Sequence, residues 1–273
     1  TAGVPDWGDD LPDWASGLNQ VMALLCAVDD NPPGKSSKTP FSPAFTALGR
    51  SVITDAGYDD DAQYSDSARD DLASSVVIRV AEIAIPSLFN NFATLRKLVE
   101  TGKVAHDGSD IFEAYIGALR QGGFKRLFLE RPVLARLIAQ EAQRATVEMR
   151  EARDRFHADR DAVIKTYFTG DDPGAVTSVQ TGLSDPHNGG RRVMIYGFGN
   201  GGKAVYKPRP LDIDAKWSEC INLMAERQAP VDLQSPVLLE RDHYGWVEFV
   251  EHLPCRDKDE VRQFFRRSGA MLA

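Results

Sequence analysis

A carboxylate and an imidazole lie two residues apart, at Asp185 and His187, inside the glycine-rich segment 184–191. An imidazole changes charge near neutral pH and an aspartate can orient it, so the pair is suited to acid–base chemistry. The backbone amides of the glycines, together with Arg191, are suited to holding a phosphate. An ordinary turn remains an alternative, because Asp, Pro, Asn and Gly are the usual turn-forming residues.

Metal binding is a third interpretation of this loop. A metal site needs several ligands at short spacing, and no second His or Cys lies near His187 in that way. His243 and His252 are distant along the chain and fit better as a hairpin residue and a surface residue. We therefore expect no metal site in this chain.

A second candidate for chemistry is Lys207, which ends a predicted β-hairpin. The segments 192–198 and 203–207 predict two strands, and the turn between them reads Gly-Asn-Gly-Gly. A helix that Asp212 can cap follows, and then a second strand pair at 237–241 and 244–250. This is the order of parts in the small lobe of a protein kinase, although a lysine in such a strand also fits an ordinary surface position.

In a kinase small lobe, the strand lysine contacts nucleotide phosphates and a glutamate of the next helix holds that lysine in place. The helix after Lys207 offers two candidates, Glu219 and Glu226. Glu226 lies nearer the expected distance along the chain, so we predict that Glu226 is the partner of Lys207.

Two helices are predicted beyond Asp212. The first carries an apolar face, and the second begins near Lys258 with its apolar residues inward. The apolar face of the first is Ile213, Trp217, Cys220, Ile221 and Met224, and the inward residues of the second are Val261, Phe264, Phe265 and Leu272.

The front of the chain has a different character, with apolar residues at helical spacing from Leu72 onward. Pro86 interrupts this pattern, which then resumes. The segment 55–71 is acidic and poor in apolar residues, so it predicts a solvated connection.

Two further helices are predicted before residue 168. Asp110 and Glu113 have the form of a capping box at the start of a helix, which Gly122 and Gly123 end. Arg, Glu and Asp are dense between 141 and 161, which predicts a long and largely exposed helix. The fold class is therefore α+β, with a helical region followed by a β-rich one.

Composition narrows the function classes. The chain has 273 residues, of which 42% are hydrophobic, and this is enough to bury a core. A net charge of -8 argues against a nucleic-acid or anionic-membrane surface. Three widely spaced cysteines do not form a disulfide framework, and we find no signal peptide and no apolar run of the roughly 20 residues that a membrane helix needs. These features favour a cytoplasmic protein with no transmembrane segment.

Three ordered blocks of the sequence resemble the dehydratase domains of class II lanthipeptide synthetases. They are Leu-Ser-Asp-Pro-His-Asn-Gly-Gly-Arg at 183–191, Ala-Val-Tyr-Lys-Pro-Arg-Pro-Leu-Asp at 204–212 and Tyr-Gly-Trp-Val-Glu-Phe-Val at 244–250. A weaker resemblance is visible at 131–137 and 155–168. The resemblance thus covers residues 130 to 273.

The resemblance implies a kinase-like enzyme of lantibiotic biosynthesis. Such an enzyme uses ATP and Mg²⁺ to phosphorylate Ser or Thr of a leader-bearing precursor peptide, and then eliminates phosphate to give dehydroalanine or dehydrobutyrine. A separate cyclase domain, which holds Zn²⁺, then forms the lanthionine rings. Carried over to this chain, Lys207 contacts nucleotide phosphate and serves phosphorylation, Asp185 and His187 serve elimination, and Arg209 matches the nucleotide-binding block.

The sequence pattern predicts a division of the chain, and the resemblance implies a missing part. We expect an N-terminal segment at 1–71, a helical region at 72–168 and a kinase-like small lobe at 169–273. The catalytic loop of the family would follow the helix that begins near Lys258, and this sequence does not contain it. We therefore expect the chain alone to be inactive as a dehydratase.

Two other functions fit the same residues. The first is a kinase-like phosphotransferase that acts on a small molecule, in which Lys207 keeps its role but Asp185 and His187 do not eliminate phosphate. The second is a non-catalytic helical module that binds a peptide, with the strands only structural.

Overall fold

The computed structural model describes residues 13–26, 39–105, 108–185, 189–228 and 233–272. These residues form two compact units. One unit holds the described residues up to Arg155 together with Gly189 and Gly190, and the other holds the rest from Phe156 onward. The protein is α+β, as predicted, with a helical front region followed by a small antiparallel sheet.

The first unit is built from helices. Its elements are α1 (Asp13–Cys26), the 3₁₀ helix η1 (Ser42–Phe45), α2 (Thr46–Asp55), α3 (Asp66–Glu100), α4 (Ile111–Ala118), the π-helical segment η2 (Leu119–Gly123), α5 (Phe124–Glu130) and the first part of α6 (Pro132–Tyr167). The predicted cap of α4 is confirmed, because the Asp110 side chain accepts hydrogen bonds from the backbone N–H groups of Phe112 and Glu113.

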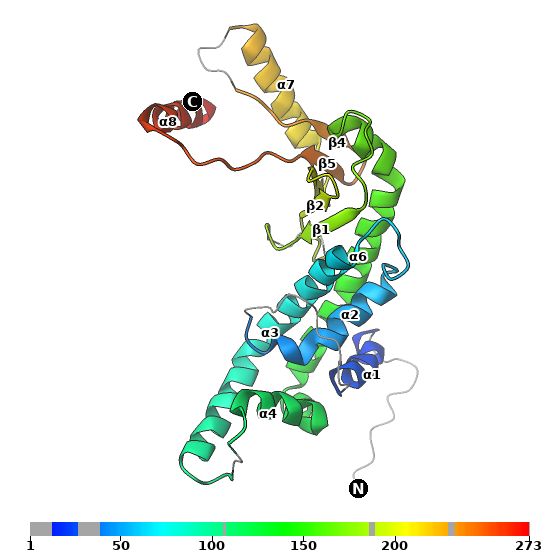
Figure 1. Cartoon of the computed structure of the whole chain (residues 1–273), viewed down its shortest axis with the longest axis vertical. Coiled ribbons are helices and arrows are strands. Elements are labelled where there is room, and N and C mark those ends of the chain that lie inside the picture. The colour runs from blue at the N-terminus through cyan, green and yellow to red at the C-terminus, as the bar shows by residue number, and fades with distance from the viewer. Residues whose placement is uncertain (1–12, 27–38, 106–107, 186–188, 229–232, 273) are drawn as a thin grey trace. The chain divides into compact units, whose positions relative to one another are not determined.

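Two predictions fail at α3, the long cyan helix of Figure 1. The helix begins at Asp66, where the Ser65 hydroxyl accepts a hydrogen bond from Ala68 N, so the end of the acidic segment 55–71 is helical. The helix also continues through Pro86. Burial of its apolar face outweighs the local preference of proline to interrupt a helix.

By length and composition alone, α3 is apolar enough to cross a membrane, which the sequence reading did not anticipate. Of the apolar window, 56% is buried inside the protein. Val76 and Val80, for example, are fully buried. A buried core helix can also meet these length and composition criteria, and the burial of α3 is typical of such a helix.

Close contact between α2 and α3 depends on Gly49. A Cβ atom at this position would lie 2.5 Å from Val77 Cγ2 and 2.7 Å from the carbonyl oxygen of Ala73. Because one of these neighbours is backbone, it cannot move aside cheaply, and the two helices can approach this closely only with glycine here.

The second unit contains a five-stranded antiparallel sheet. The strands are β1 (Val176–Gln180), β2 (Met194–Phe198), β3 (Lys203–Lys207), β4 (Leu238–Glu240) and β5 (Gly245–Glu248), in the spatial order β1-β2-β3-β5-β4. The predicted hairpin and the second strand pair are confirmed. β1 was not predicted, and it lies in a stretch rich in Gly, Ser, Thr and Asp.

Aromatic side chains from α6 and the sheet form the core of this unit. The rings of Phe156 and Tyr196 lie 5.2 Å apart, and the Trp246 ring lies 5.2 Å from those of both Tyr196 and Tyr206. All four side chains are at most 2% exposed. The charged stretch 141–161 of α6 is thus not largely exposed as predicted. Its first part packs within the helical unit, where Glu148 pairs with Arg79 of α3, and its last part covers the sheet through Phe156.

A buried carboxylate lies beside this aromatic core. Asp159 of α6 is 3% exposed, and it accepts hydrogen bonds from Trp246 Nε1 at 2.9 Å and from Arg241 Nε at 2.7 Å. Both oxygens are therefore satisfied, and the ion pair fixes β5 and the end of β4 against the helix.

Two helices complete this unit, α7 (Asp212–Glu226) and α8 (Lys258–Leu272). Both were predicted, but their apolar faces are not buried as expected. On α7 only Ile221 is buried, and none of the residues of α8 is. Trp217 is 41% exposed and Phe265 is 68% exposed.

Replacement of Asp159 by alanine should destabilise the chain by about 1 to 3 kcal/mol, the usual cost of leaving a buried hydrogen-bonding group without its partner. The loss arises because the buried Trp246 indole N–H is left without an acceptor, and the partly exposed Arg241 guanidinium loses its ion pair. The free energy of unfolding, measured by urea denaturation, tests this. Asp161→Ala removes an exposed carboxylate from the same helix and should change stability by less than about 0.5 kcal/mol; equal effects of the two variants would refute the prediction.

Gly49→Ala should destabilise the protein by about 1 to 3 kcal/mol, because the added methyl group forces α2 and α3 apart. Gly117 of α4 offers a matched control, since a Cβ there meets nothing within 4 Å. Gly117→Ala should stabilise the protein by about 0.5 to 1 kcal/mol through helix propensity. Thermal unfolding followed by circular dichroism compares the two variants, and shifts of the same sign would contradict the assignment.

Candidate functional site

Lys207 is the last residue of β3, where it pairs in register with Gly245 of β5. The chain then turns through Leu211, which is 1% exposed, into the first turn of α7. The Leu211 side chain occupies the space that a Cβ at Gly245 would need. The glycine therefore lets the start of α7 pack against the end of the sheet, next to the lysine.

A single carboxylate connects the cations of this turn. Asp214 Oδ1 accepts a hydrogen bond from Lys207 Nζ at 3.0 Å, and Asp214 Oδ2 accepts one from Arg209 Nη1 at 2.7 Å. A weaker contact of 3.3 Å joins Arg209 Nη2 to Asp214 Oδ1. Lys207 and Arg209, which the sequence predicted as site residues, are thus joined by Asp214, which it did not predict.

These ion pairs are partly shielded from water. The side chains of Lys207 and Asp214 are 24% and 21% exposed, and that of Arg209 is 39% exposed. Burial acts to raise the pKa of Asp214, but hydrogen bonds from Arg209 and Lys207 outweigh it and hold the pKa below its ordinary value. Asp214 is therefore ionised at neutral pH.

The predicted pairing of Lys207 with a glutamate of α7 is not what the structure shows. Glu219 forms an ion pair with Lys216 at the surface, at 2.7 Å. Glu226 is exposed at the C-terminal end of α7. Asp214 precedes both glutamates along α7, and its short side chain reaches the end of β3 from the first turn. A nucleotide contact by Glu226 stays a prediction.

The acid–base loop is only partly described. His187 lies outside the described residues, so the proximity of its imidazole to Asp185 stays a prediction. Asp185 is exposed, and it makes no hydrogen bond or ion pair with any described residue. Its neighbour Ser184 accepts a hydrogen bond from Val193 N at 3.3 Å, which ties this side of the loop to the start of β2.

Asp214 could have been suspected from the sequence by one signal. It lies in an acidic first helical turn, in the run Asp-Ile-Asp at 212–214, seven residues after Lys207. Acidic residues are common in a first turn because they interact favourably with the helix dipole. Because the helix dipole already accounts for both aspartates, nothing in the sequence indicated that Asp214 also pairs with Lys207 and Arg209.

Within the described part of the chain, no three His, Cys, Asp or Glu residues lie close enough to hold a metal ion. The cations at the end of β3 suit an anion instead. Lys207 and Arg209 together carry two positive charges against the one negative charge of Asp214, so the cluster has a net charge of +1. A phosphate group fits this donor set.

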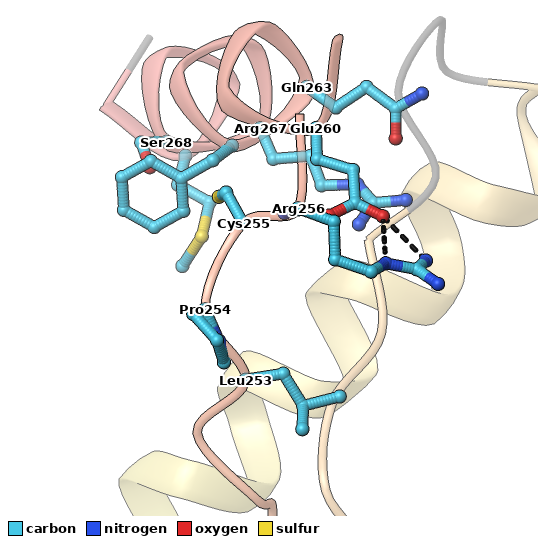
Figure 2. Close-up of a pocket in the computed structure, with 10 residues that line it drawn as sticks. Leu253, Pro254, Cys255, Arg256, Glu260, Gln263, Arg267 and Ser268 are labelled. Carbon is cyan, nitrogen blue, oxygen red and sulfur yellow. Dashed lines mark hydrogen bonds and ion pairs between the residues drawn. The ribbon is translucent and has the colours of Figure 1, made fainter. Parts of the chain in front are cut away.

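The second unit also has a pocket at another place. It lies between α8 and the segment that precedes it, and Figure 2 shows its one ion pair, from Arg256 to Glu260. None of the predicted site residues lines it. Its walls include Leu253, Pro254, Phe264 and Met271. Its walls also carry Arg256 and Arg267 beside the one carboxylate of Glu260. Neither arginine lies in a segment whose sequence predicted chemistry, so we place the candidate site at Lys207.

The fold and the site define an α+β protein whose small sheet ends in a cation pair suited to an anionic ligand. The chain belongs to the family described as a domain of unknown function, DUF4135, whose match covers residues 132–273. That range contains α6, the whole sheet and both predicted site segments. No curated protein matches the chain.

The lowered pKa of Asp214 gives a pH dependence with a defined sign. The ionised carboxylate contributes stability above its unfolded pKa, near 4, and this contribution is lost as the pH falls toward its lower folded pKa. Asp214→Asn should therefore be less stable than wild type near neutral pH, and the difference should shrink below about pH 4. Urea denaturation over this pH range measures the difference. A difference that widens in acid would contradict the assignment.

Proposed function

We propose that this chain is part of the dehydratase region of a class II lanthipeptide synthetase. The observation that carries the proposal is the Lys207–Arg209 cation pair, held at the end of β3 beside the start of α7. A kinase small lobe places its phosphate-binding lysine in the same topological position, on a central strand followed by a helix. Membership of DUF4135 supports the proposal coarsely, because such domains are found in lanthipeptide synthetases.

In the proposed reaction, ATP is the phosphate donor and a leader-bearing precursor peptide is the acceptor. The γ-phosphoryl group moves to a Ser or Thr hydroxyl, ADP leaves, and the hydroxyl proton passes to a base. Lys207 and Arg209 would bind phosphate oxygens of the nucleotide, supplied as its magnesium complex. Phosphate charge is thereby stabilised by groups already oriented before the ligand binds.

Elimination is the second proposed step. A base removes the α-proton of the phosphorylated residue, the electrons form the Cα–Cβ double bond, and phosphate leaves with the bonding pair of the C–O bond. His187, oriented by Asp185, is suited to the proton transfer, since an imidazole exchanges protons near neutral pH. Over the two steps the residue loses one water, while ATP becomes ADP and phosphate.

The cellular setting belongs to the same proposal. Cys26, Cys220 and Cys255 are unpaired and exposed, which is expected of a protein in a reducing cytoplasm. The partners would be the precursor peptide and a zinc-containing cyclase domain that adds cysteine thiols to the dehydrated residues.

Mass spectrometry of the precursor peptide tests the proposal. The intact gene product is incubated with the peptide, ATP and Mg²⁺, and wild type is compared with His187→Ala and Lys207→Ala. Wild type should remove the mass of water from Ser or Thr residues. His187→Ala should accumulate phosphopeptide, because only elimination is blocked, whereas Lys207→Ala should leave most of the peptide unmodified.

The outcomes separate the proposal from its rivals. Normal dehydration by His187→Ala would remove the assigned role of the loop. A wild-type protein that consumes ATP with a small-molecule acceptor but never modifies the peptide would indicate a different phosphotransferase. A protein that binds the peptide without using ATP would indicate a non-catalytic module.

A further inference from the structure

We propose that Asp214 is the positioning residue of the phosphate-binding site, a role assigned in kinase small lobes to a helix glutamate. The inference rests on the proposed function and extends it, since it concerns how Lys207 and Arg209 are held for a nucleotide. Asp214 would act through these two cations and would not itself touch the phosphate.

The geometry favours Asp214 because one carboxylate fixes both cations. Its Oδ1 atom accepts from Lys207 Nζ at 3.0 Å and its Oδ2 atom accepts from Arg209 Nη1 at 2.7 Å. A flexible lysine and a flexible arginine, two residues apart on the chain, are thereby held at a common point. Orientation of this kind lowers the entropy that binding and reaction would otherwise lose.

The carboxylate itself has a rigid support. Asp214 lies in the first turn of α7, where Ala215 N bonds to Leu211 O and Ser218 Oγ bonds to Asp214 O at 3.0 Å. Leu211 is buried against the sheet, as described above. The carboxylate that holds the two cations is therefore positioned by a helix packed on the sheet, although Arg209 itself lies in the turn between β3 and α7.

Donor groups remain available for a ligand. An ammonium group has three N–H donors, and Asp214 is the one hydrogen-bond partner of Lys207 Nζ within the described chain. Arg209 gives one N–H to the Pro210 carbonyl at 3.0 Å, besides those to Asp214, and its Nε donates to no described residue. Two lysine donors and the arginine Nε can thus reach phosphate oxygens while Asp214 stays in place.

The net charge of the cluster of Lys207, Arg209 and Asp214 predicts a kinetic pattern that distinguishes a positioning role of Asp214 from a purely structural one. Asp214→Asn raises the net charge of the cluster from +1 to +2, so attraction of ATP should not weaken. Lys207 and Arg209 would, however, lose their common anchor and adopt several orientations. We expect kcat for peptide phosphorylation to fall by about 10- to 100-fold, while KM for ATP stays unchanged or decreases.

The experiment uses the intact gene product with Mg²⁺·ATP and the precursor peptide, and measures ADP release together with the thermal midpoint of each variant. Asp212→Asn is the matched control, because it removes an exposed carboxylate from the same helical turn and makes no contact with Lys207. It should retain wild-type kcat. Asp214→Glu keeps the charge on a longer side chain, and its kcat should lie between those of Asp214→Asn and wild type.

A double-mutant cycle adds a readout that global instability does not produce. If Asp214 acts through Lys207, then Lys207→Met should cost far less in the Asp214→Asn background than in wild type. Additive effects of the two substitutions would overturn the inference. So would wild-type kcat in Asp214→Asn, a rise in its KM for ATP, or a fall in its apparent kcat that only parallels a loss of folded protein.

Failure of the inference and failure of the proposed function give different results. If wild type phosphorylates the peptide and Asp214→Asn does so equally well, only the positioning role is rejected. If wild type itself neither binds nor consumes ATP, the proposed function is rejected, and the positioning role is rejected with it. Should Asp214→Asn fail to fold, Asp214→Glu decides: reduced kcat at unchanged KM supports the role, and wild-type kcat excludes it.

Discussion

The second unit depends on one buried carboxylate, that of Asp159. A small sheet of short strands buries little apolar surface by itself, so it needs a helix across one face to be stable. Asp159 fixes that helix by accepting hydrogen bonds from Trp246 and Arg241, which belong to the paired strands β5 and β4 or lie directly beside them. The cost of burying its charge is offset because both partners are hydrogen-bonded and one is a cation.

The candidate site follows from the position of that sheet. With β5 fixed against α6, its partner β3 ends beside Gly245, and the missing side chain there admits Leu211. Leu211 in turn sets where α7 begins, and the first turn of α7 carries Asp214. The ion pair of Asp159 and that of the candidate site thus lie on the same part of the sheet, and they differ in that the carboxylate of the first is buried whereas Asp214 is partly exposed.

Some of this arrangement was predictable from residues alone. The turn Gly-Asn-Gly-Gly at 199–202, between the segments 192–198 and 203–207, predicted the hairpin. The resemblance of 204–212 to a family motif identified Lys207 and Arg209. The choice of their carboxylate partner was wrong, since Glu226 was inferred from distance along the chain, whereas the actual partner depends on which helical turn faces the end of β3.

The sequence by itself determined the fold class, the type and order of most elements, and the cationic residues of the site, because periodicity, turn chemistry and charge are local properties. Only the tertiary structure decided that α3 continues through Pro86, that the charged helix α6 covers a sheet, and that Asp214 holds both cations. It also decided that the apolar faces of α7 and α8 lie exposed in the described chain. Each of these depends on which surfaces meet, and an amphipathic pattern specifies that a face is apolar without specifying what covers it.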